Sequence, residues 1–356
     1  MSPLLGWDVG GAHVKACLRI DGLVRDIAQW PCPLWQGLQH LDDVLAEARQ
    51  RWPEGWQPQA RHVATMTGEM VDLFPDREEG VARLSARLAE ALGPSLMLYA
   101  GPRATGEGID WVAPPDARSR WSAIASANWR ATAQLLASHQ QQALLVDIGS
   151  TTTDLIPLRD GRVCAQGVSD AERLATGELV YHGVVRTPLC ALGPRVPIGG
   201  HKVNVMSEFF ATTADVYRLT GELDPSHDQQ PTADGGVKDL AATRQRLARM
   251  VGCDARDHAD DEWLRLAHFW RGAQLREIGA NIERVAANAG LAAHAPLVAA
   301  GCGAFLAQDW AARSRRLCLR FADCVPTPYE EHPPAWAHWA DVCAPAVAVA
   351  LLAGKG

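Results

Sequence analysis

The sequence predicts an α/β protein made of two related halves, each with a mixed sheet flanked by helices, around a central cleft. Two observations predict this class. Residues 4–22 read as an apolar strand, a glycine pair, a second strand and an Asp-Gly turn, which indicates a β-hairpin with a glycine-rich bend. Residues 143–161 repeat this order later in the chain, and stretches with helical spacing separate the two copies.

The first half, residues 1–140, alternates predicted strands and helices after its hairpin. Apolar side chains at 41, 44, 45 and 48 follow helical spacing, which predicts a helix over 39–51. The same periodicities predict strands at 62–67 and 96–100, and helices at 79–92 and 121–139.

The second half, residues 141–356, begins with the second hairpin and carries an insertion. We expect this insertion, residues 165–250, to contact substrate, and its stretch 221–236 has the Asp, Pro and Gln content of an exposed loop. Beyond it we predict a helix at 260–290, a buried strand at 296–300 that runs into a glycine turn at 301–303, a helix at 304–313, a strand at 315–321 and a helix at 344–353.

Composition and charge limit the classes of partner. The chain has 356 residues, and its formal net charge of −7 is spread along it, which favours solubility over nucleic-acid binding. Its apolar stretches reach about ten residues, whereas a membrane-spanning helix needs about 20. The start lacks the basic segment of a secretory signal, and the nine cysteines include no Cys-x-x-Cys pair for zinc. We therefore expect a cytoplasmic protein that acts on small molecules and binds neither membranes nor nucleic acid.

Three glycine-rich turns each follow an apolar strand, and they predict phosphate binding. Glycine permits positive φ and lets a ligand approach the backbone, whose consecutive N–H groups form an anion-binding concavity. For each turn alone, a plain hairpin without a ligand stays open. The predicted phosphate ligands are Gly10, Gly11, His13 and Lys15 in the first turn and Gly149, Ser150, Thr151, Thr152 and Thr153 in the second, while Gly301 and Gly303 are predicted to contact a nucleotide or the substrate.

The strands that lead into the first two glycine-rich turns each carry an aspartate near their end, and this predicts a divalent cation. A carboxylate repels phosphate, but Asp8 and Asp147 can hold Mg²⁺ or Mn²⁺, usually through water, and the ion then bridges to the phosphates. We therefore treat both aspartates as catalytic residues. Asp154 is a further candidate metal ligand.

Three other residues are candidates with a structural alternative. Glu69 follows a predicted strand and is a candidate catalytic base, or equally a solvated carboxylate in a turn. Arg186 and Lys202 are candidates for binding a carboxylate or phosphate of the substrate. For Lys202, an ordinary surface position is at least as good an interpretation.

Several stretches resemble a known superfamily. Residues 8–15 and 147–154 resemble the two phosphate motifs of the actin, sugar kinase and heat-shock chaperone superfamily, and 298–305 resemble its adenosine motif. Within it the chain resembles the hydantoinase/oxoprolinase group. More narrowly it resembles the tetrahydromethanopterin-linked C1-transfer pathway family, which includes the furan-methanamine synthase of methanofuran biosynthesis. The stretches that carry this narrower resemblance are 127–133, 177–188, 210–219, 232–235 and 246–250.

The resemblance covers nearly the whole chain and implies two actin- or ribonuclease-H-like halves. It implies a transferase that joins an (aminomethyl)furanyl-methyl diphosphate to the phenol oxygen of a glutamylated tyramine or tyrosine-type acceptor and releases pyrophosphate. His13 stands where the superfamily commonly has Thr or Asn, so it either donates an N–H to phosphate or lies outside the site.

Alternatives to this function stay open. One is an ATP-dependent small-molecule kinase or a hydantoinase-like hydrolase, for which ATP or ADP would be a ligand. Another is a non-catalytic nucleotide-binding subunit. The oligomeric state also stays open, with a homodimer as one alternative.

Overall fold

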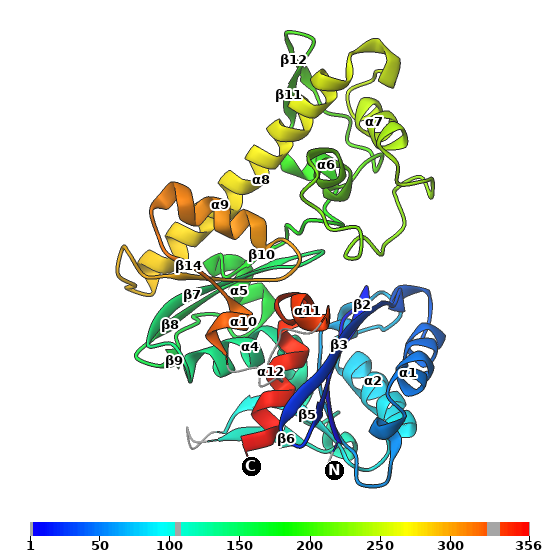
Figure 1. Cartoon of the computed structure of the whole chain (residues 1–356), viewed down its shortest axis with the longest axis vertical. Coiled ribbons are helices and arrows are strands. Elements are labelled where there is room, and N and C mark those ends of the chain that lie inside the picture. The colour runs from blue at the N-terminus through cyan, green and yellow to red at the C-terminus, as the bar shows by residue number, and fades with distance from the viewer. Residues whose placement is uncertain (1–2, 104–107, 326–334, 356) are drawn as a thin grey trace. The chain divides into compact units, whose positions relative to one another are not determined.

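The computed structural model describes residues 3–103, 108–325 and 335–355, and it divides the chain into two compact units. Unit 1 comprises Met1–Gln141, Asp160–Val163 and Arg320–Gly356, and unit 2 comprises Gln142–Arg159 and Cys164–Leu319. Each unit holds a mixed sheet flanked by helices (Figure 1), which confirms the predicted α/β class. Among the residues described, no helix has the length and apolar character that crossing a membrane requires.

The sheet of unit 1 has the strand order β3-β2-β1-β4-β5-β6. Strand β1 is parallel to β4, and β4 is parallel to β5, whereas the other neighbours are antiparallel. The strands are β1 (Pro3–Val9), β2 (His13–Ile20), β3 (Leu23–Pro31), β4 (Arg61–Met66), β5 (Leu96–Pro102) and β6 (Ile109–Val112), and β9 (Arg162–Val163) lies against α4.

Helix α12 (Ala344–Leu352) packs on the centre of this sheet, against β1, β2 and β4. All nine of its residues are buried. A Cβ added at Gly6 of β1 would lie 2.4 Å from the carbonyl oxygen of Ala346, so the close contact between strand and helix requires glycine there. The last helix of the sequence thus completes the first sheet.

The other helices of unit 1 are α1 (Gln39–Arg51), α2 (Arg77–Leu92), α3 (Trp121–Ile124), α4 (Asn128–Ala137), α10 (Phe321–Cys324) and α11 (Trp339–Val342). The predicted single helix over 121–139 is wrong, because the chain breaks between α3 and α4. Ser126 lies at the break with φ 49°, a left-handed conformation that a helix cannot contain.

The two predicted Asp-Gly turns are confirmed. Asp21 and Gly22 have φ values of 52° and 84°, and Asp160 and Gly161 have 55° and 67°. Two successive positive φ values match the twist of a two-residue hairpin turn, and Asp-Gly tolerates them at low cost.

Unit 2 repeats the beginning of the first sheet. Its strand order is β10-β8-β7-β13-β14, with β7 antiparallel to β8 and parallel to β13. The strands are β7 (Gln142–Ile148), β8 (Thr153–Arg159), β10 (Leu179–Val180), β13 (Leu297–Ala300) and β14 (Cys318–Arg320), and β11 (Arg195–Ile198) and β12 (His201–Asn204) form a separate hairpin.

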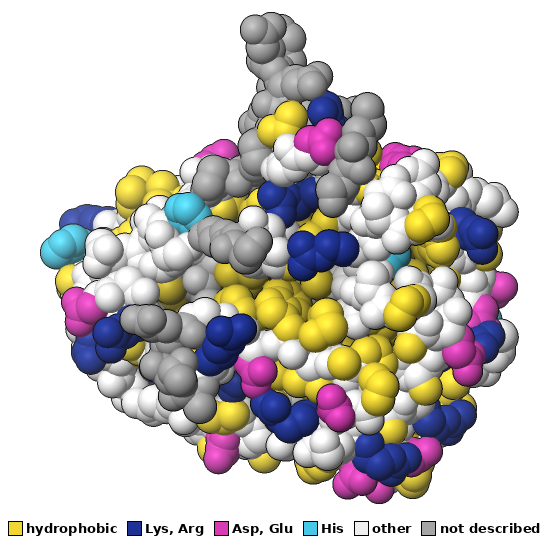
Figure 2. Space-filling view, turned by 90° about the horizontal axis from the view of Figure 1, so that it is seen from below, with side chains coloured by type: hydrophobic (Ala, Val, Ile, Leu, Met, Phe, Trp, Pro, Cys, Tyr) yellow, Lys and Arg dark blue, Asp and Glu magenta, His cyan; other side chains and the backbone are white. Residues whose placement is uncertain are grey.

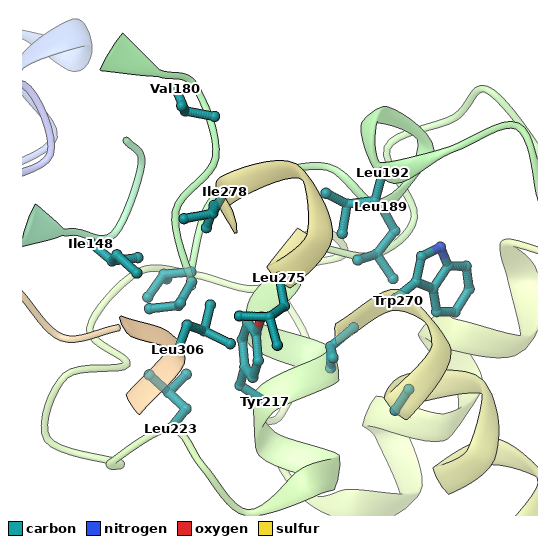
Figure 3. Packing of buried hydrophobic residues seen from close by; sticks show 14 of the residues in the cluster. Ile148, Val180, Leu189, Leu192, Tyr217, Leu223, Trp270, Leu275, Ile278 and Leu306 are labelled. Carbon is teal, nitrogen blue, oxygen red and sulfur yellow. The ribbon is translucent and has the colours of Figure 1, made fainter. Parts of the chain in front are cut away.

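One long helix organises the core of unit 2. Helix α8 (Asp260–Asn288) contacts β7, β8, β11 and α6, and its buried side chains meet those of the sheet and of α9 (Figure 3). Ile148, Tyr217, Leu275, Ile278 and Leu306 belong to this cluster. The remaining helices are α5 (Asp170–Thr176), α6 (Thr213–Thr220), α7 (Leu240–Arg249) and α9 (Ala304–Ser314).

The predicted loop at 221–236 contains no helix or strand, but it is less exposed than expected. Arg218 Nε lies 2.5 Å from Asp228 Oδ2, and Arg246 Nη1 lies 3.3 Å from Asp234 Oδ1. Both arginines also contact Asp215 Oδ1 at 2.7 Å. These ion pairs fix the loop to α6 and α7, and Asp228 is buried.

Candidate phosphate-binding hairpins

The second hairpin joins β7 to β8 through a loop at residues 149–152. Ile148 pairs with Thr153, and the Gly149 N–H donates to the Thr152 carbonyl at 2.8 Å, which closes the loop. Asp147 stands one residue before the end of β7, where it faces Asp154 across the strand pair.

The segment after β10 holds this loop from one side. Val184 N–H donates to the Gly149 carbonyl at 3.0 Å, and the N–H groups of Val185 and Arg186 donate to the Ser150 carbonyl at 3.1 and 2.9 Å. A Cβ at Gly183 would lie 2.4 Å from the Thr151 nitrogen, so this contact requires glycine. Sequence reasoning missed Gly183, although it lies inside the family stretch 177–188.

Polar side chains gather at the same loop. Arg186 Nη1 donates to Thr151 Oγ1 at 3.3 Å, so the structure brings the predicted substrate-binding arginine to the second turn. Burial lowers the pKa of Arg186, and the nearby phenol of Tyr181 partly offsets this effect. Ser150 Oγ is buried, and it has no hydrogen-bond partner among the described residues. The loop therefore offers a cation and hydroxyl groups at one place.

Gly149 is not required by the packing of this chain. It is absent from the glycines with positive φ, and a Cβ there would meet only the Thr152 carbonyl oxygen, at 3.5 Å. The expectation that the turn glycines use positive φ is therefore wrong for Gly149, Gly10 and Gly11. The space beside Gly149 is instead suited to a ligand that approaches the backbone closely.

Gly301 and Gly303 have a structural explanation. Gly301 has φ 80°, and a Cβ there would lie 2.2 Å from the Ile148 carbonyl oxygen. At Gly303 a Cβ would lie 2.5 Å from Ile148 Cγ2, and its N–H donates to the Ile148 carbonyl at 2.8 Å. The two glycines bring the start of α9 against the end of β7, and contact with a nucleotide stays a prediction.

The two acidic residues of this hairpin differ in their surroundings. Asp147 is partly exposed, whereas Asp154 pairs with Arg173 of α5, whose side chain is 2% exposed. A cation at Asp154 would have to displace this buried guanidinium, which favours a structural role for Asp154. The described residues contain no group of three or more His, Cys, Asp or Glu side chains that could hold a metal ion.

The first hairpin, in unit 1, closes in the same way with different side chains. The Gly10 N–H donates to the His13 carbonyl at 2.9 Å. Asp8 faces Lys15 across the strands, with 3.9 Å between Asp8 Oδ2 and Lys15 Nζ. Asp8 and His13 are both buried, at 3% and 7% exposure.

The glycines of this first turn are crowded. A Cβ at Gly10 would lie 2.9 Å from the His13 carbonyl oxygen, and one at Gly11 would lie 2.8 Å from Val71 Cγ1. The packing of unit 1 therefore requires small residues here, and their presence does not by itself indicate a ligand.

Glu69 is not a solvated carboxylate in a turn. It lies in the short 3-10 helix Gly68–Met70 and is 1% exposed. Ser126 Oγ–H donates to Glu69 Oε1 at 2.9 Å and accepts from Arg77 Nη2 at 3.0 Å. This network ties Glu69 to the break between α3 and α4, and a role as base would require its opening.

Lys202 lies apart from the second loop. It is exposed on β12, and the neighbouring Gly199 N–H donates to Glu262 Oε1 near the start of α8. Gln274 of the same helix donates to the Gly183 carbonyl beside the loop. At 1.5 Å per residue these two helix positions are about 18 Å apart.

On the face drawn in Figure 2, Lys and Arg side chains lie among Asp and Glu side chains around an apolar area. Charges of both signs thus occur on this face.

Comparison with known proteins identifies relatives. The hydantoinase/oxoprolinase family model matches residues 108–318. A protein of Methanocaldococcus jannaschii named (4-{4-[2-(gamma-L-glutamylamino)ethyl]phenoxymethyl}furan-2-yl)methanamine synthase is 29% identical over 285 residues, which are 80% of this chain and 82% of the relative. A protein of Methanococcus vannielii with the same name is 32% identical over 151 residues, 42% of this chain and 68% of the relative.

Similar solved structures include component A of the (R)-2-hydroxyglutaryl-CoA dehydratase of Acidaminococcus fermentans. It has a TM-score of 0.45 and 10% identity, and the match covers 99% of this chain and 97% of that one. The family match spans more than half of the sequence and includes the whole second hairpin. The chain belongs to the hydantoinase/oxoprolinase family.

Proposed function

We propose that the protein is a transferase that forms an aryl ether in methanofuran or methylofuran biosynthesis. It condenses an (aminomethyl)furanyl-methyl diphosphate with the phenol oxygen of a glutamyltyramine or tyrosine-type acceptor and releases pyrophosphate. The compound in the relatives' name contains a phenoxymethyl group on a furan, which is the ether that this condensation makes.

The reaction breaks the bond between the furanyl methylene carbon and a diphosphate oxygen, and it forms a bond from that carbon to the phenol oxygen. The bonding electrons leave with pyrophosphate, and the phenol gives up its proton. The furan ring stabilises positive charge on the methylene carbon as the diphosphate departs. Stabilisation of the departing negative charge is therefore the main catalytic requirement.

The second hairpin loop is the observation that carries the proposal. Gly149 leaves space beside the backbone, the buried hydroxyl of Ser150 is available as a donor, and Arg186 lies against Thr151. An arginine and hydroxyl groups at one loop match the oxygens of a diphosphate. In this proposal, the loop binds the diphosphate and Arg186 neutralises charge as it leaves.

Asp147 fits a magnesium site at this loop. Mg²⁺ is commonly bound by one or two carboxylates, waters and substrate phosphates, and Asp147 is a partly exposed carboxylate at the end of β7. When bound there, Mg²⁺ would neutralise charge on the leaving diphosphate. Asp8 is the weaker candidate, because Lys15 already lies opposite its carboxylate.

The phenol proton needs a late transfer or a base outside the residues predicted from sequence. An unperturbed phenol has a pKa of about 10, so it is protonated at neutral pH. Glu69 is enclosed by Ser126 and Arg77. We therefore favour proton loss after the carbon–oxygen bond has begun to form, when the phenol oxygen has become more acidic.

An assay for pyrophosphate tests the proposal. Purified protein receives the furanyl-methyl diphosphate, glutamyltyramine or tyrosine, and Mg²⁺, without ATP, and mass spectrometry follows the ether product. We expect pyrophosphate and ether in equal amounts, and loss of both with excess EDTA. Arg186→Gln should lower turnover strongly, whereas Arg195→Gln, on the exposed strand β11, should not. Absence of pyrophosphate from the wild-type protein would rule the proposal out.

A second candidate is an ATP-dependent kinase or hydrolase. The N-terminus of α9 favours this candidate, because a helix N-terminus attracts phosphate. Gly301 and Gly303 precede this helix and bring its start against the end of β7. The same assay distinguishes it, since ATP would then be required and ADP would be released. Nucleotide binding without turnover would indicate a non-catalytic subunit instead.

A further inference from the structure

Tyr181 differs from the other tyrosines that the structure describes. Tyr99 and Tyr217 are fully buried, and their hydroxyls donate to Gln134 and Gln274 at 2.5 and 2.7 Å. Tyr181 is 59% exposed. An exposed aromatic ring beside a binding loop can stack on a flat ring of a ligand.

The backbone carries Tyr181 to the second hairpin loop. β10 is an edge strand, in which Leu179 pairs with Asp154 and Val180 with Thr153 of β8. Tyr181 is the next residue, so it follows β10 at the point where the loop joins β8. His182 then accepts a hydrogen bond from Thr153 Oγ1 at 2.7 Å, and Gly183 packs on Ser150.

Arg186 returns to the loop five residues after Tyr181. Its N–H donates to the Ser150 carbonyl, and its guanidinium donates to Thr151. Burial lowers the pKa of Arg186, and the phenol of Tyr181 raises it by a smaller amount. An exposed ring and a guanidinium thus lie on one segment, at residues 181–186, beside the loop.

We propose that Tyr181 determines specificity for the group that the diphosphate carries, by stacking on a flat aromatic ring such as furan while the loop and Arg186 hold the diphosphate. This inference rests on the proposed function and adds a ring-binding residue to it. It separates two parts of recognition, because inorganic pyrophosphate uses the loop alone, whereas a furanyl-methyl diphosphate uses the loop and Tyr181.

Calorimetric titration of the full chain, with Mg²⁺ and without acceptor, tests this separation. The two probes are furanyl-methyl diphosphate and inorganic pyrophosphate. We expect the wild-type protein to bind the furanyl compound more tightly. Tyr181→Ala should weaken the furanyl compound about five- to tenfold and leave pyrophosphate within about twofold, and Tyr181→Phe should bind both as the wild type does.

Phe209→Ala is the matched control. Phe209 is 57% exposed in the same unit and precedes Ala211, which accepts from Leu189 N–H, so it lies outside the segment 181–186. We expect it to change neither affinity. Unchanged affinity for the furanyl compound in Tyr181→Ala, or equal weakening of both probes, would overturn the role of Tyr181 alone. Failure of the wild-type protein to bind the furanyl compound would overturn the proposed function as well.

Discussion

The two hairpins place an aspartate at the same position, one residue before the first strand ends, and surround it differently. Asp8 faces Lys15, so the chain itself supplies the opposite charge. Asp147 faces Asp154. The second carboxylate pairs with Arg173, which lies on α5 and not on either strand of the hairpin. The duplicated backbone thus holds an internal ion pair in unit 1 and an acidic pair supported by a buried arginine in unit 2.

The two turns also differ in how much space surrounds their glycines. Gly11 is crowded by Val71, whereas a Cβ at Gly149 would make only one ordinary contact, 3.5 Å from the Thr152 carbonyl oxygen, and Ser150, Thr151 and Arg186 lie around it. Where an added Cβ would clash, the packing of the chain explains the glycine. Where it would not clash, close approach of a ligand to the backbone is an alternative explanation. The comparison therefore supports the proposal that the hairpin of unit 2, rather than that of unit 1, binds the diphosphate.

The largest effect that tests this comparison is expected from Asp147→Asn. Loss of the carboxylate that would organise Mg²⁺ should lower kcat/KM about a thousandfold, since each 1.36 kcal/mol of barrier is about tenfold in rate. Circular dichroism should show an intact fold. Asp8→Asn should lower the unfolding temperature, because the ion pair between Asp8 and Lys15 is lost. Wild-type rates in Asp147→Asn would contradict the proposed role of Asp147 in holding Mg²⁺.

Arg173→Gln tests the support of the acidic pair. Breaking a buried ion pair should lower the free energy of unfolding of unit 2 by about 3 kcal/mol. Hydrogen exchange of the β8 amides in urea reports on this unit. The double variant Arg173→Gln/Asp154→Asn should regain part of the loss, because Asp154 is then neutral while Asp170, which also faces Arg173, stays charged. No difference between the single and double variants would contradict the pairing.

His62 should make unit 1 sensitive to acid. Burial lowers its pKa to about 4, and Trp7 Nε1–H donates to its Nδ1 at 3.2 Å. The unfolded imidazole takes up a proton near pH 6.5, so this stability is present above pH 6.5 and is lost as the pH falls towards 4. We expect a loss of about 2 kcal/mol between pH 7 and pH 5, measured by urea unfolding. His62→Gln should remove this slope, and an unchanged slope would exclude His62 as its source.

The smallest effect concerns the turn glycines. Gly11→Ala should destabilise the protein by about 1 kcal/mol, because its Cβ meets Val71 at 2.8 Å. Gly149→Ala should change stability by less than about 0.5 kcal/mol. Thermal unfolding of the two variants measures the difference. Equal destabilisation would contradict the inference that packing requires glycine at 11 but not at 149.

Local patterns predicted much of the fold. The predicted helix at 39–51 is α1 (Gln39–Arg51), because one apolar stripe specifies it, and both Asp-Gly turns follow from the conformations that these residues tolerate. Long-range packing set what the sequence did not reveal. Strand β3 was missed, and α12 packs on β1, which lies at the other end of the chain.

The candidate site was predicted only where a local motif marks it. The second loop and Arg186 were identified from the sequence, and the structure brings them together. Tyr181 and Gly183 were missed because their place beside the loop comes from the pairing of β10 with β8, which no local pattern contains. Glu69 was interpreted from its place after a strand, and its burial depends on Ser126, which is distant in sequence.

Direct binding measurements test most sharply the proposal that the loop at 149–152 binds diphosphate. Isothermal titration of Mg²⁺-pyrophosphate into the wild-type chain and into Gly149→Val compares the open and the filled loop. We predict measurable binding to the wild type and its loss in Gly149→Val, with the far-ultraviolet spectrum unchanged. Equal affinity in the two proteins would contradict the assignment of this hairpin as the diphosphate site.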